Sequence, residues 1–398
     1  MLEAQDHRKL GERLDLFHFQ EEAPGMAFWH PDGFFLYRKL EECVRRHFLA
    51  QGYREVRTPQ ILRRSIWEKS GHWEHFNRGM FRIAEAIPEA AVKPVSCPGH
   101  IQILQRDVVS WRQLPIRFAE FGIVHRDEPG GTLHGLLRLQ QFTQDDGHIF
   151  CRMEQAQEEV VRFIESVPGF YRKFGFERLD AALSLRPEDR AGNDSQWDLS
   201  EGALRSALER TGIRYREQPG AGAFYGPKIE FSLRDRQGRD WQCGTIQFDL
   251  VMPERFDVRY IGKDSERVPC VMLHRALYGS LERFLAILLE HHGSRLPAWL
   301  CPVQARILPV GKEQEDGAVT LASRIKEMGM RPLVDARKET LSRRIAESSE
   351  MAIPWVVVLG AREEREGRLV LRRRDGTQES LPLEEALARM SADCSEPA

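Results

Sequence analysis

Side chains that can bind a phosphate or ligate a metal are concentrated between residues 116 and 150 (IRFAEFGIVHRDEPGGTLHGLLRLQQFTQDDGHIF). Arg126 and Arg138 flank a Gly-rich segment, and each guanidinium can offer paired donors to a phosphate group. A cluster of acidic residues ending at His148 follows, and such residues can hold an amine or a metal ion. This segment could therefore bind a nucleotide beside a small polar substrate.

A β-hairpin is expected to hold these residues, because two apolar, β-prone runs flank the Gly-Gly pair at 130–131. Strands are also predicted at 52–59 and 223–252, the latter turning at 236–240. Helical periodicity is found at 34–50 and 152–175. The apolar side of the first helix comprises Leu36, Leu40, Cys43 and Val44. We therefore predict that residues 1–300 form an α+β domain built on an antiparallel sheet.

A smaller α/β domain is predicted over residues 301–398, after the prolines at 297 and 302. The expected elements are strand 305–311, helix 314–328, strand 331–336, helix 340–351, strand 355–360, a hairpin around 375–376 and helix 383–392. The run WVVVLG at 355–360 is apolar throughout, as expected of a strand covered on both faces.

Bulk properties limit the function classes. The net charge is −2, so nucleic-acid binding would need local basic patches, with candidates at 343–344 and 372–374. Solvated charged faces are the alternative interpretation of both. No apolar run is long enough for a membrane span, and the N-terminal segment lacks the apolar core of a secretory signal. The 7 scattered cysteines do not indicate a disulfide framework, so a cytoplasmic location is expected.

Two common nucleotide-binding motifs are absent from the sequence. There is neither a GxxxxGK[ST] loop nor a Rossmann glycine fingerprint. A bound nucleotide must therefore be held by another architecture.

The ordered motifs resemble those of the class II aminoacyl-tRNA synthetases, most closely the threonyl-tRNA synthetases. GYREVRTPQ is similar to motif 1, the HRDE–LLR hairpin to motif 2, and HRALYGSLERF to motif 3. AFYGPKIEF and DWQCGTIQFD resemble the strands of the family's threonine pocket, and residues 301–398 resemble its anticodon-binding domain. The resemblance covers nearly the whole chain and implies a homodimer with motif 1 at the interface.

The resemblance implies an ATP site that also takes Mg²⁺ with the nucleotide. Arg126 and Arg283 would stabilise the charge that develops on the α-phosphate. Glu128 would read the adenine amine, Phe142 would stack on the ring, and Arg138 would bind the far phosphates. Surface salt bridges are the alternative interpretation of these arginines.

The resemblance also implies a zinc site formed by Cys97, His148 and His274, which leaves one coordination position open for substrate. A zinc ion that binds both the amine and the hydroxyl of threonine would reject valine, which has no hydroxyl. The three ligands are too far apart in the sequence to form a local metal motif. Without the resemblance, a buried thiol and two satisfied histidines would be the default interpretation.

A threonine pocket is expected around this zinc ion. By resemblance Asp146 would accept hydrogen bonds from the threonine hydroxyl and amine. The residues expected to complete the pocket are Gln144, Tyr225 and Gln247.

His72 has an expected role in transfer to tRNA, and the position of His274 sets a condition on motif 3. His72 matches the position that, in the family, deprotonates the terminal ribose of tRNA, and a structural histidine beside Trp73 is the alternative. His274 and Arg283 would lie on opposite faces of one helix. Both can serve one site only if His274 lies on a strand and the helix begins near Gly279.

The sequence departs from the family pattern at several positions. Val95-Ser96 replaces the usual Met-Asn before the cysteine, and Gln140-Gln141 occupies a part of motif 2 for which the resemblance gives no role. In the C-terminal domain the positions that match anticodon contacts are Glu363 and Arg372. Lys338 and Ala352 stand where the common bacterial pattern has Asn and Arg, so we expect anticodon reading to be weaker or differently tuned.

The sequence therefore predicts a threonine–tRNA ligase that uses ATP and L-threonine to charge threonine tRNA. Because the chain begins almost at the catalytic domain, we expect no editing domain and slow release of seryl-tRNA. One alternative is a paralogue that activates threonine for another acceptor or acts as an inhibitor-resistant spare copy. The other is a non-catalytic, synthetase-like RNA-binding protein, against which the intact motif arginines and ligand positions count.

Overall fold

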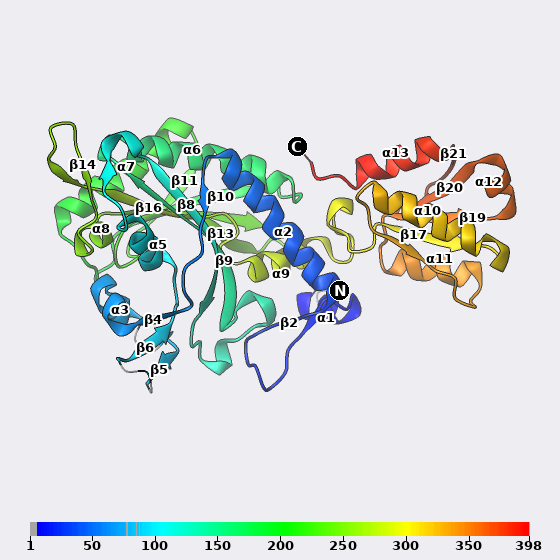
Figure 1. Cartoon of the computed structure of the whole chain (residues 1–398), viewed down its shortest axis with the longest axis horizontal. Coiled ribbons are helices and arrows are strands. Elements are labelled where there is room, and N and C mark those ends of the chain that lie inside the picture. The colour runs from blue at the N-terminus through cyan, green and yellow to red at the C-terminus, as the bar shows by residue number, and fades with distance from the viewer. Residues whose placement is uncertain (1–5, 77–78, 85, 87, 398) are drawn as a thin grey trace. The chain divides into compact units, whose positions relative to one another are not determined.

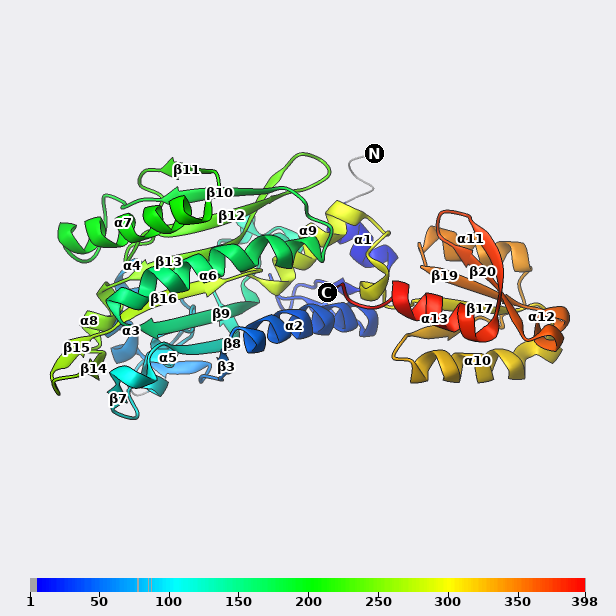
Figure 2. The same ribbon diagram turned by 90° about the horizontal axis from the view of Figure 1, so that it is seen from above.

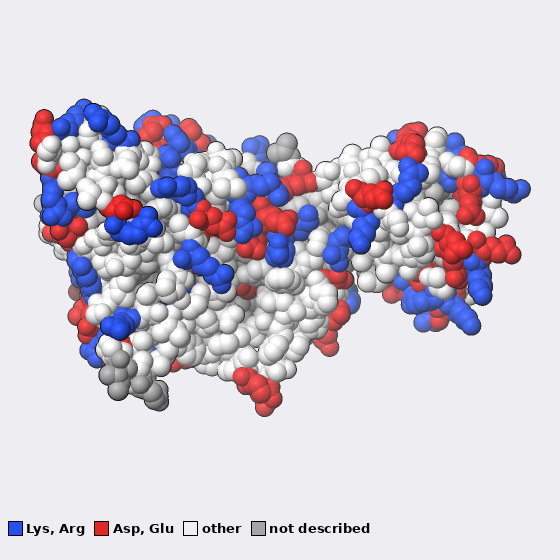
Figure 3. Space-filling model, in the orientation of Figure 1, with Lys and Arg blue, Asp and Glu red and all other residues white. Residues whose placement is uncertain are grey.

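The computed structural model describes residues 6–76, 79–84, 86 and 88–397. The chain divides into two compact units (Figure 1). The larger unit comprises His18–Phe28 and Leu40–Ile287, and the smaller comprises Met1–Phe17, Trp29–Lys39 and Leu288–Ala398. On the face seen in Figure 3, basic and acidic side chains are interspersed, in agreement with the net charge of −2.

The larger unit is built on an 8-stranded sheet with the order β11-β10-β12-β13-β16-β9-β8-β3. Its strands are β3 (Arg54–Glu55), β8 (Ile116–His125), β9 (Gln141–Cys151), β10 (Leu179–Ser184), β11 (Tyr215–Gln218), β12 (Lys228–Arg234), β13 (Asp240–Asp249) and β16 (Val271–Ala276). Only the two edge pairs, β10 with β11 and β3 with β8, are parallel. The predicted antiparallel sheet is therefore confirmed.

Two long helices, α6 (Met153–Arg172) and α7 (Asp194–Thr211), lie side by side and contact the sheet at β13 (Figure 2). On α6 the buried residues Ala156, Val160, Phe163 and Val167 recur at helical spacing, which confirms the helix predicted at 152–175. Asn193 caps the start of α7 by accepting a hydrogen bond from the Gln196 amide.

The opposite face of the sheet carries the short helix α5 (Cys97–Leu104). Cys97, Ile101 and Leu104 face one side of this helix and belong to an apolar cluster with Phe118 of β8 and Phe150 of β9. This packing holds the N-terminus of α5 against the centre of the sheet. The cluster also includes residues from β7 (Val109–Ser110), α8 (Val251–Arg255) and β14 (Arg259–Ile261) or their immediate neighbours.

Both predicted hairpins of the larger unit are present. β8 and β9 pair from His125–Gln141 to Ile116–Phe150, and residues 126–140 connect them through two short 3-10 turns. β12 and β13 pair from Arg234–Asp240 onward, so the turn lies where it was predicted.

A long helix precedes motif 1, and motif 1 itself contains a very short strand. Helix α2 (Pro31–Ala50) confirms the helix predicted at 34–50, and the four predicted apolar residues are all buried. The strand predicted at 52–59 is confined to Arg54–Glu55. It stops early because the Thr58 amide donates to the Glu120 carboxylate rather than to a neighbouring strand.

The sequence did not predict several small elements. They include the sheet β4 (Ile61–Arg63), β5 (Arg82–Ile83) and β6 (Ala90–Val92), the sheet β7, β14 and β15 (Arg267–Pro269), and the helices α3 (Arg64–Ser70) and α4 (His72–His75). The helix α7 and the strands β10 and β11 were not predicted either. None of the helices in the described part of the chain has both the length and the apolar character of a membrane span.

The C-terminal part of the smaller unit is a 5-stranded sheet with the order β18-β17-β19-β20-β21. Its elements are β17 (Ala305–Pro309), α10 (Glu315–Glu327), β18 (Pro332–Val334), α11 (Leu341–Glu350), β19 (Trp355–Leu359), α12 (Ala361–Glu366), β20 (Arg368–Arg373), β21 (Gln378–Pro382) and α13 (Leu383–Asp393). The predicted α/β order is confirmed, except that α12 was not expected. Its sequence, AREERE, has no apolar periodicity.

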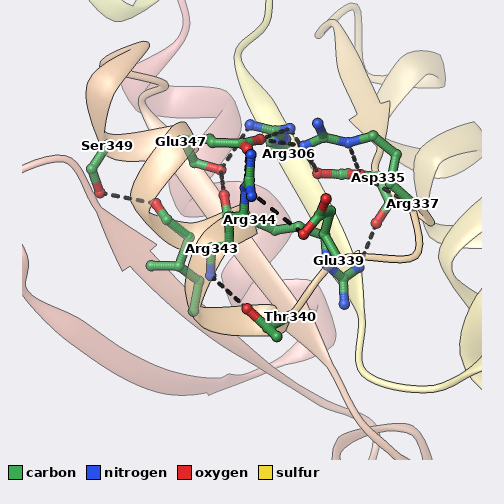
Figure 4. A network of polar contacts seen from close by, with 11 residues as sticks. Arg306, Asp335, Arg337, Glu339, Thr340, Arg343, Arg344, Glu347 and Ser349 are labelled. Atoms are coloured by element: carbon green, nitrogen blue, oxygen red, sulfur yellow. Dashed lines mark hydrogen bonds and ion pairs between the residues drawn. The ribbon is translucent and has the colours of Figure 1, made fainter.

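A buried polar network lies under α11 (Figure 4). Arg306 donates to the Asp335 carboxylate at 2.7 Å, and Arg344 donates to the backbone oxygens of Asp335 and Pro309 at 2.6 and 3.0 Å. Arg343 is ion-paired with Glu347. The candidate basic patch at 343–344 is therefore largely engaged within the domain, and Arg344 is buried.

Candidate active site

Alternation along three adjacent strands brings polar side chains to one face of the large sheet. On β9 these are Gln144, Asp146 and His148. On β16 His274 lies opposite His148 on one side and opposite Gln247 of β13 on the other. The predicted zinc and threonine residues on these strands are thus neighbours because a two-residue period places them there.

A cavity of about 440 Å³ opens beside these strands and contains the predicted nucleotide site. All five residues predicted to bind ATP line it: Arg126, Glu128, Arg138, Phe142 and Arg283. Gln144 and Gln247, predicted for the threonine pocket, line it as well. Other residues that line the cavity were not predicted as site residues, among them Gln242, Cys243 and Thr245.

The two motif arginines in this cavity have guanidinium groups that could bind an anion. The Arg126 guanidinium lies 5.2 Å from the centre of the Phe142 ring, and burial lowers its pKa. The Nε atom of Arg283 is buried and has no hydrogen-bond partner within the described part of the chain. A phosphate in the cavity would satisfy such a donor.

Glu128 and Arg138 face each other across the motif 2 loop. Their charged groups are 2.7 Å apart, and Arg138 is about half exposed. This exposed pair contributes little stability, so opening it for a nucleotide would cost little.

The structure gives Gln140 and Gln141 roles that the sequence did not suggest. The Gln140 side chain donates to the Glu128 backbone oxygen at 3.0 Å, and its backbone amide donates to the Gly25 oxygen. The Gln141 side chain contacts the His125 ring at 3.2 Å. Gln140 therefore fixes the backbone that carries Glu128.

The geometric condition set by motif 3 is met. His274 lies on strand β16, and helix α9 (Leu281–His292) begins only after Gly279. Gly279 has a φ of +77°, which favours glycine. The turn between strand and helix therefore allows His274 and Arg283 to face the same region.

Two buried acids tie this turn to β9. Asp145 accepts hydrogen bonds from the amides of Leu277, Tyr278 and Gly279, and Glu282 accepts from the Thr143 amide at 2.9 Å. Burial raises the pKa of Asp145 to about 6 and that of Glu282 to about 7. The sequence did not predict these two clamps, although Asp145 alternates with the site residues on β9.

The three predicted zinc ligands converge. The donor atoms of Cys97, His148 and His274 all lie within 4.8 Å of one another, and all three residues are buried. Burial and the carboxylates of Asp146 and Asp249 raise the pKa of the Cys97 thiol. A zinc cation would offset this cost by binding the thiolate, so the donor set and its surroundings fit the metal.

The predicted threonine-pocket residues surround this triad. An Asp146 carboxylate oxygen is 3.6 Å from Nε2 of His148. The Tyr225 hydroxyl donates to the Gln247 side chain, and the Tyr225 ring centre is 5.0 Å from that of His274.

His72 is buried among aromatic rings rather than exposed. Its ring lies near Trp67, Phe76 and Phe224, and its Nδ1 atom is 2.8 Å from the Ser70 hydroxyl. Burial lowers the pKa of His72 to about 3, so the ring is neutral at physiological pH.

Behind the three predicted zinc ligands lies a second set of buried polar residues that the sequence did not predict. Asp249 contacts His274, while His100, Glu120 and Lys93 extend behind His148. Although burial opposes ionisation, hydrogen bonds from His100 and Lys93 lower the pKa of Glu120 to about 2. The only sequence signal was the spacing of His100 three residues after Cys97, on the same helical face.

Comparison with known proteins agrees with this geometry. The profile of the tRNA synthetase class II core domain (G, H, P, S and T) matches residues 81–292, and that of the anticodon binding domain matches residues 304–393. The crystal structure of the RNA binding domain of threonyl-tRNA synthetase from Cryptosporidium parvum Iowa II superposes with a TM-score of 0.95, at 39% identity and with 99% of each chain covered. The chain belongs to the threonyl-tRNA synthetase family. The resemblance and the fold class predicted from the sequence are thereby confirmed.

Curated relatives in the family include threonine–tRNA ligases from Halorhodospira halophila and Caulobacter vibrioides, each 50% identical to this chain. The alignments cover 98% and 99% of the chain but only 61% of each relative, so the chain spans about three fifths of their length. A putative threonyl-tRNA synthetase from Aeropyrum pernix is similar in structure, with a TM-score of 0.84 at 29% identity.

The residues predicted to contact the anticodon lie on two elements of the smaller unit. Glu363 lies in α12, where its carboxylate accepts a hydrogen bond from the Gly360 amide, and Arg372 lies next to the C-terminal end of β20. Of the two positions that depart from the family pattern, Lys338 is exposed, and Ala352 is buried after α11 with a φ of +51°.

Proposed function

We propose that the protein is a threonine–tRNA ligase. Threonine and ATP would form threonyl-adenylate and pyrophosphate, and the threonyl group would then pass to the 3′ end of threonine tRNA. The observation that supports this most strongly is the single polar face shared by β9, β13 and β16. There the predicted ATP residues and the Cys97–His148–His274 cluster adjoin one another.

In the first step an oxygen of the threonine carboxylate would attack the α-phosphorus atom, and pyrophosphate would leave. Arg126 and Arg283 would stabilise the charge that develops on the α-phosphate. Phe142 would stack on adenine, and Glu128 and Arg138 would separate to bind the adenine amine and the far phosphates. ATP would enter as its Mg²⁺ complex, as in class II synthetases generally.

Zinc bound by Cys97, His148 and His274 would supply a Lewis-acid position that recognises an amine next to a hydroxyl. Asp146 would accept hydrogen bonds from both threonine groups. Gln144, Tyr225 and Gln247 would complete the pocket. Valine lacks the hydroxyl that these contacts require, so we expect it to be rejected.

In the second step the terminal ribose of tRNA would have to reach His72, which is only 1% exposed in this structure. With a pKa of about 3, the His72 ring is neutral and able to accept a hydrogen bond from a ribose hydroxyl. Glu363 and Arg372 would contact the anticodon. We also propose a cytoplasmic homodimer, because tRNA charging accompanies protein synthesis and because β3 of motif 1 is an edge strand of the sheet.

The decisive test is transfer of radiolabelled threonine to purified threonine tRNA. We expect threonine-dependent, ATP-dependent charging by the zinc-loaded protein. If threonyl-adenylate forms but no tRNA is charged, the protein activates threonine for another acceptor. The departures at Lys338 and Ala352 make this outcome the second candidate.

A further inference from the structure

We propose that the buried pair His100–Glu120 orients His148 so that its Nε2 atom is the metal ligand. This assigns His100 and Glu120 as positioning residues of the metal site, and it rests on the proposed function only in taking that metal to be zinc. The pair and its partner Lys93 are called the relay below.

The relay is continuous and buried. Nδ1 of His148 is 2.8 Å from Nδ1 of His100, and Nε2 of His100 is 3.1 Å from the Glu120 carboxylate. Glu120 in turn accepts from Nζ of Lys93 at 2.8 Å. His100, Glu120 and Lys93 are each at most 2% exposed, so water does not compete for these contacts.

The carboxylate fixes the direction of every hydrogen bond in the relay. Glu120 can only accept, so Nε2 of His100 must carry the proton that it donates. A singly protonated imidazole that donates through Nε2 accepts through Nδ1, so this arrangement makes Nδ1 of His148 the donor. That order leaves the lone pair of His148 on Nε2, which is the atom that faces His274.

The Asp249 carboxylate orients the His274 ring in the same way. Its Nε2 atom is 2.9 Å from Asp249, which also accepts the amides of Val251 and Met252. Asp249 therefore leaves the lone pair of His274 on Nδ1. The two nitrogen atoms that carry these lone pairs, Nε2 of His148 and Nδ1 of His274, are 2.9 Å apart. A cation between them would bind both.

These distances suit zinc after a small adjustment. Tetrahedral zinc with nitrogen ligands near 2.0–2.1 Å would separate the two nitrogens by about 3.3 Å. The rings therefore need to open by only a few tenths of an ångström. Carboxylate partners of ligating histidines commonly set ring orientation, and their loss typically weakens metal binding by about 10- to 100-fold.

The test compares zinc affinity in two variants of one residue. His100→Leu removes both hydrogen bonds, whereas His100→Gln can still accept from His148 and donate to Glu120. We expect His100→Leu to weaken Zn²⁺ binding by about 10- to 100-fold in competition with a chromogenic chelator. His100→Gln should stay within a few-fold of the unmodified protein, and its Co²⁺ absorption spectrum should be unchanged.

His47→Leu is the matched control, since His47 is a partly buried histidine of the same unit that contacts Gln51 and Phe170. Its zinc affinity should not change. If His100→Leu fails to fold by circular dichroism, His100→Asn replaces it, because Asn is too short to reach both partners.

The inference would be overturned if His100→Leu bound zinc within twofold of the affinity of the unmodified protein. It would also be overturned if His100→Leu and His100→Gln weakened zinc binding equally. An unmodified protein that binds no zinc would overturn it together with the zinc site. A protein that binds zinc but does not activate threonine would instead refute the proposed function, because the relay is measured by metal binding alone.

Discussion

At the scale of single residues, the proposed activation of threonine depends on two guanidinium groups that line one cavity, Arg126 and Arg283. Arg283 is the sharper case because its buried Nε atom lacks a partner within the described part of the chain. Lysine at this position would keep the charge but lose the planar fork that binds a phosphate.

We therefore predict that Arg283→Lys lowers kcat for threonyl-adenylate formation by roughly 100-fold, as expected for the loss of one transition-state donor. Arg205→Lys is the control, because Arg205 forms an exposed ion pair with Glu217 on the same unit. Stopped-flow or pyrophosphate-exchange kinetics would measure both. A loss of less than threefold for Arg283→Lys would argue against its role.

The resemblance, rather than spacing, selected Gln144, Asp146 and His148 from the sequence. Their alternation along β9 is local, so a strand at this position is enough to place them on one face. The partners behind the predicted zinc ligands could not be predicted in this way. His100, Glu120 and Asp249 come from three different elements, and only the folded chain brings them close to His148 and His274.

At the scale of elements, the turn between β16 and α9 is held by buried acids that titrate near neutral pH. Glu282 has its pKa raised by burial from 4.5 to about 7. The folded state thus favours the protonated form. The stabilising contribution is full below pH 4.5 and is lost as the pH rises through 7.

Glu282→Gln should remove this pH dependence while keeping an acceptor for the Thr143 amide. We predict that the stability of the unmodified protein relative to the variant falls by about 3 kcal/mol between pH 5 and pH 8. Urea unfolding at both pH values would measure it. Glu158→Gln, at an exposed residue, is the control. Parallel stability curves for the unmodified protein and Glu282→Gln would contradict the assignment.

The second prediction about an element concerns the stability that the polar network under α11 contributes. Hydrogen bonds from Arg337 and the charge of Arg306 lower the pKa of Asp335 from 3.8 to about 2. Its contribution is therefore present above pH 3.8 and is lost as the pH falls through 2. Asp335→Asn should destabilise the C-terminal domain by about 3 kcal/mol at neutral pH, since it leaves the buried Arg306 with only the Glu347 carboxylate, 3.7 Å away, as a charge partner.

Thermal unfolding would measure this change. Glu366→Gln breaks the exposed pair with Arg362 and should change stability very little. An equal effect of the two substitutions would show that burial does not strengthen the Asp335 network.

Two of the long helices were predictable, whereas the 18-residue helix α7 and the short strands were not predicted. Apolar side chains at helical spacing in the sequence predict the helices at 31–50 and 153–172. The two small 3-stranded sheets consist of strands of two or three residues, whose partners are distant in the sequence. Strand β3 ends where the Glu120 side chain captures the Thr58 amide, which no local pattern indicates.

At the scale of the whole molecule, activation and tRNA recognition are assigned to different units. Arg372→Ala should therefore lower kcat/KM for tRNA charging by about tenfold or more, the usual effect of losing a base contact. Threonine activation without tRNA should not change. Arg368→Ala, on the same strand β20, is the control. Equal charging by Arg372→Ala and the unmodified protein would remove Arg372 from the proposed anticodon site.

The central claim is that the cavity and the metal cluster together activate threonine. Threonine-dependent exchange of pyrophosphate into ATP tests it most directly, with zinc-loaded protein and no tRNA. We predict exchange with threonine and little or none with valine, which lacks the hydroxyl. Folded, zinc-loaded protein that shows no threonine-dependent exchange would contradict the account.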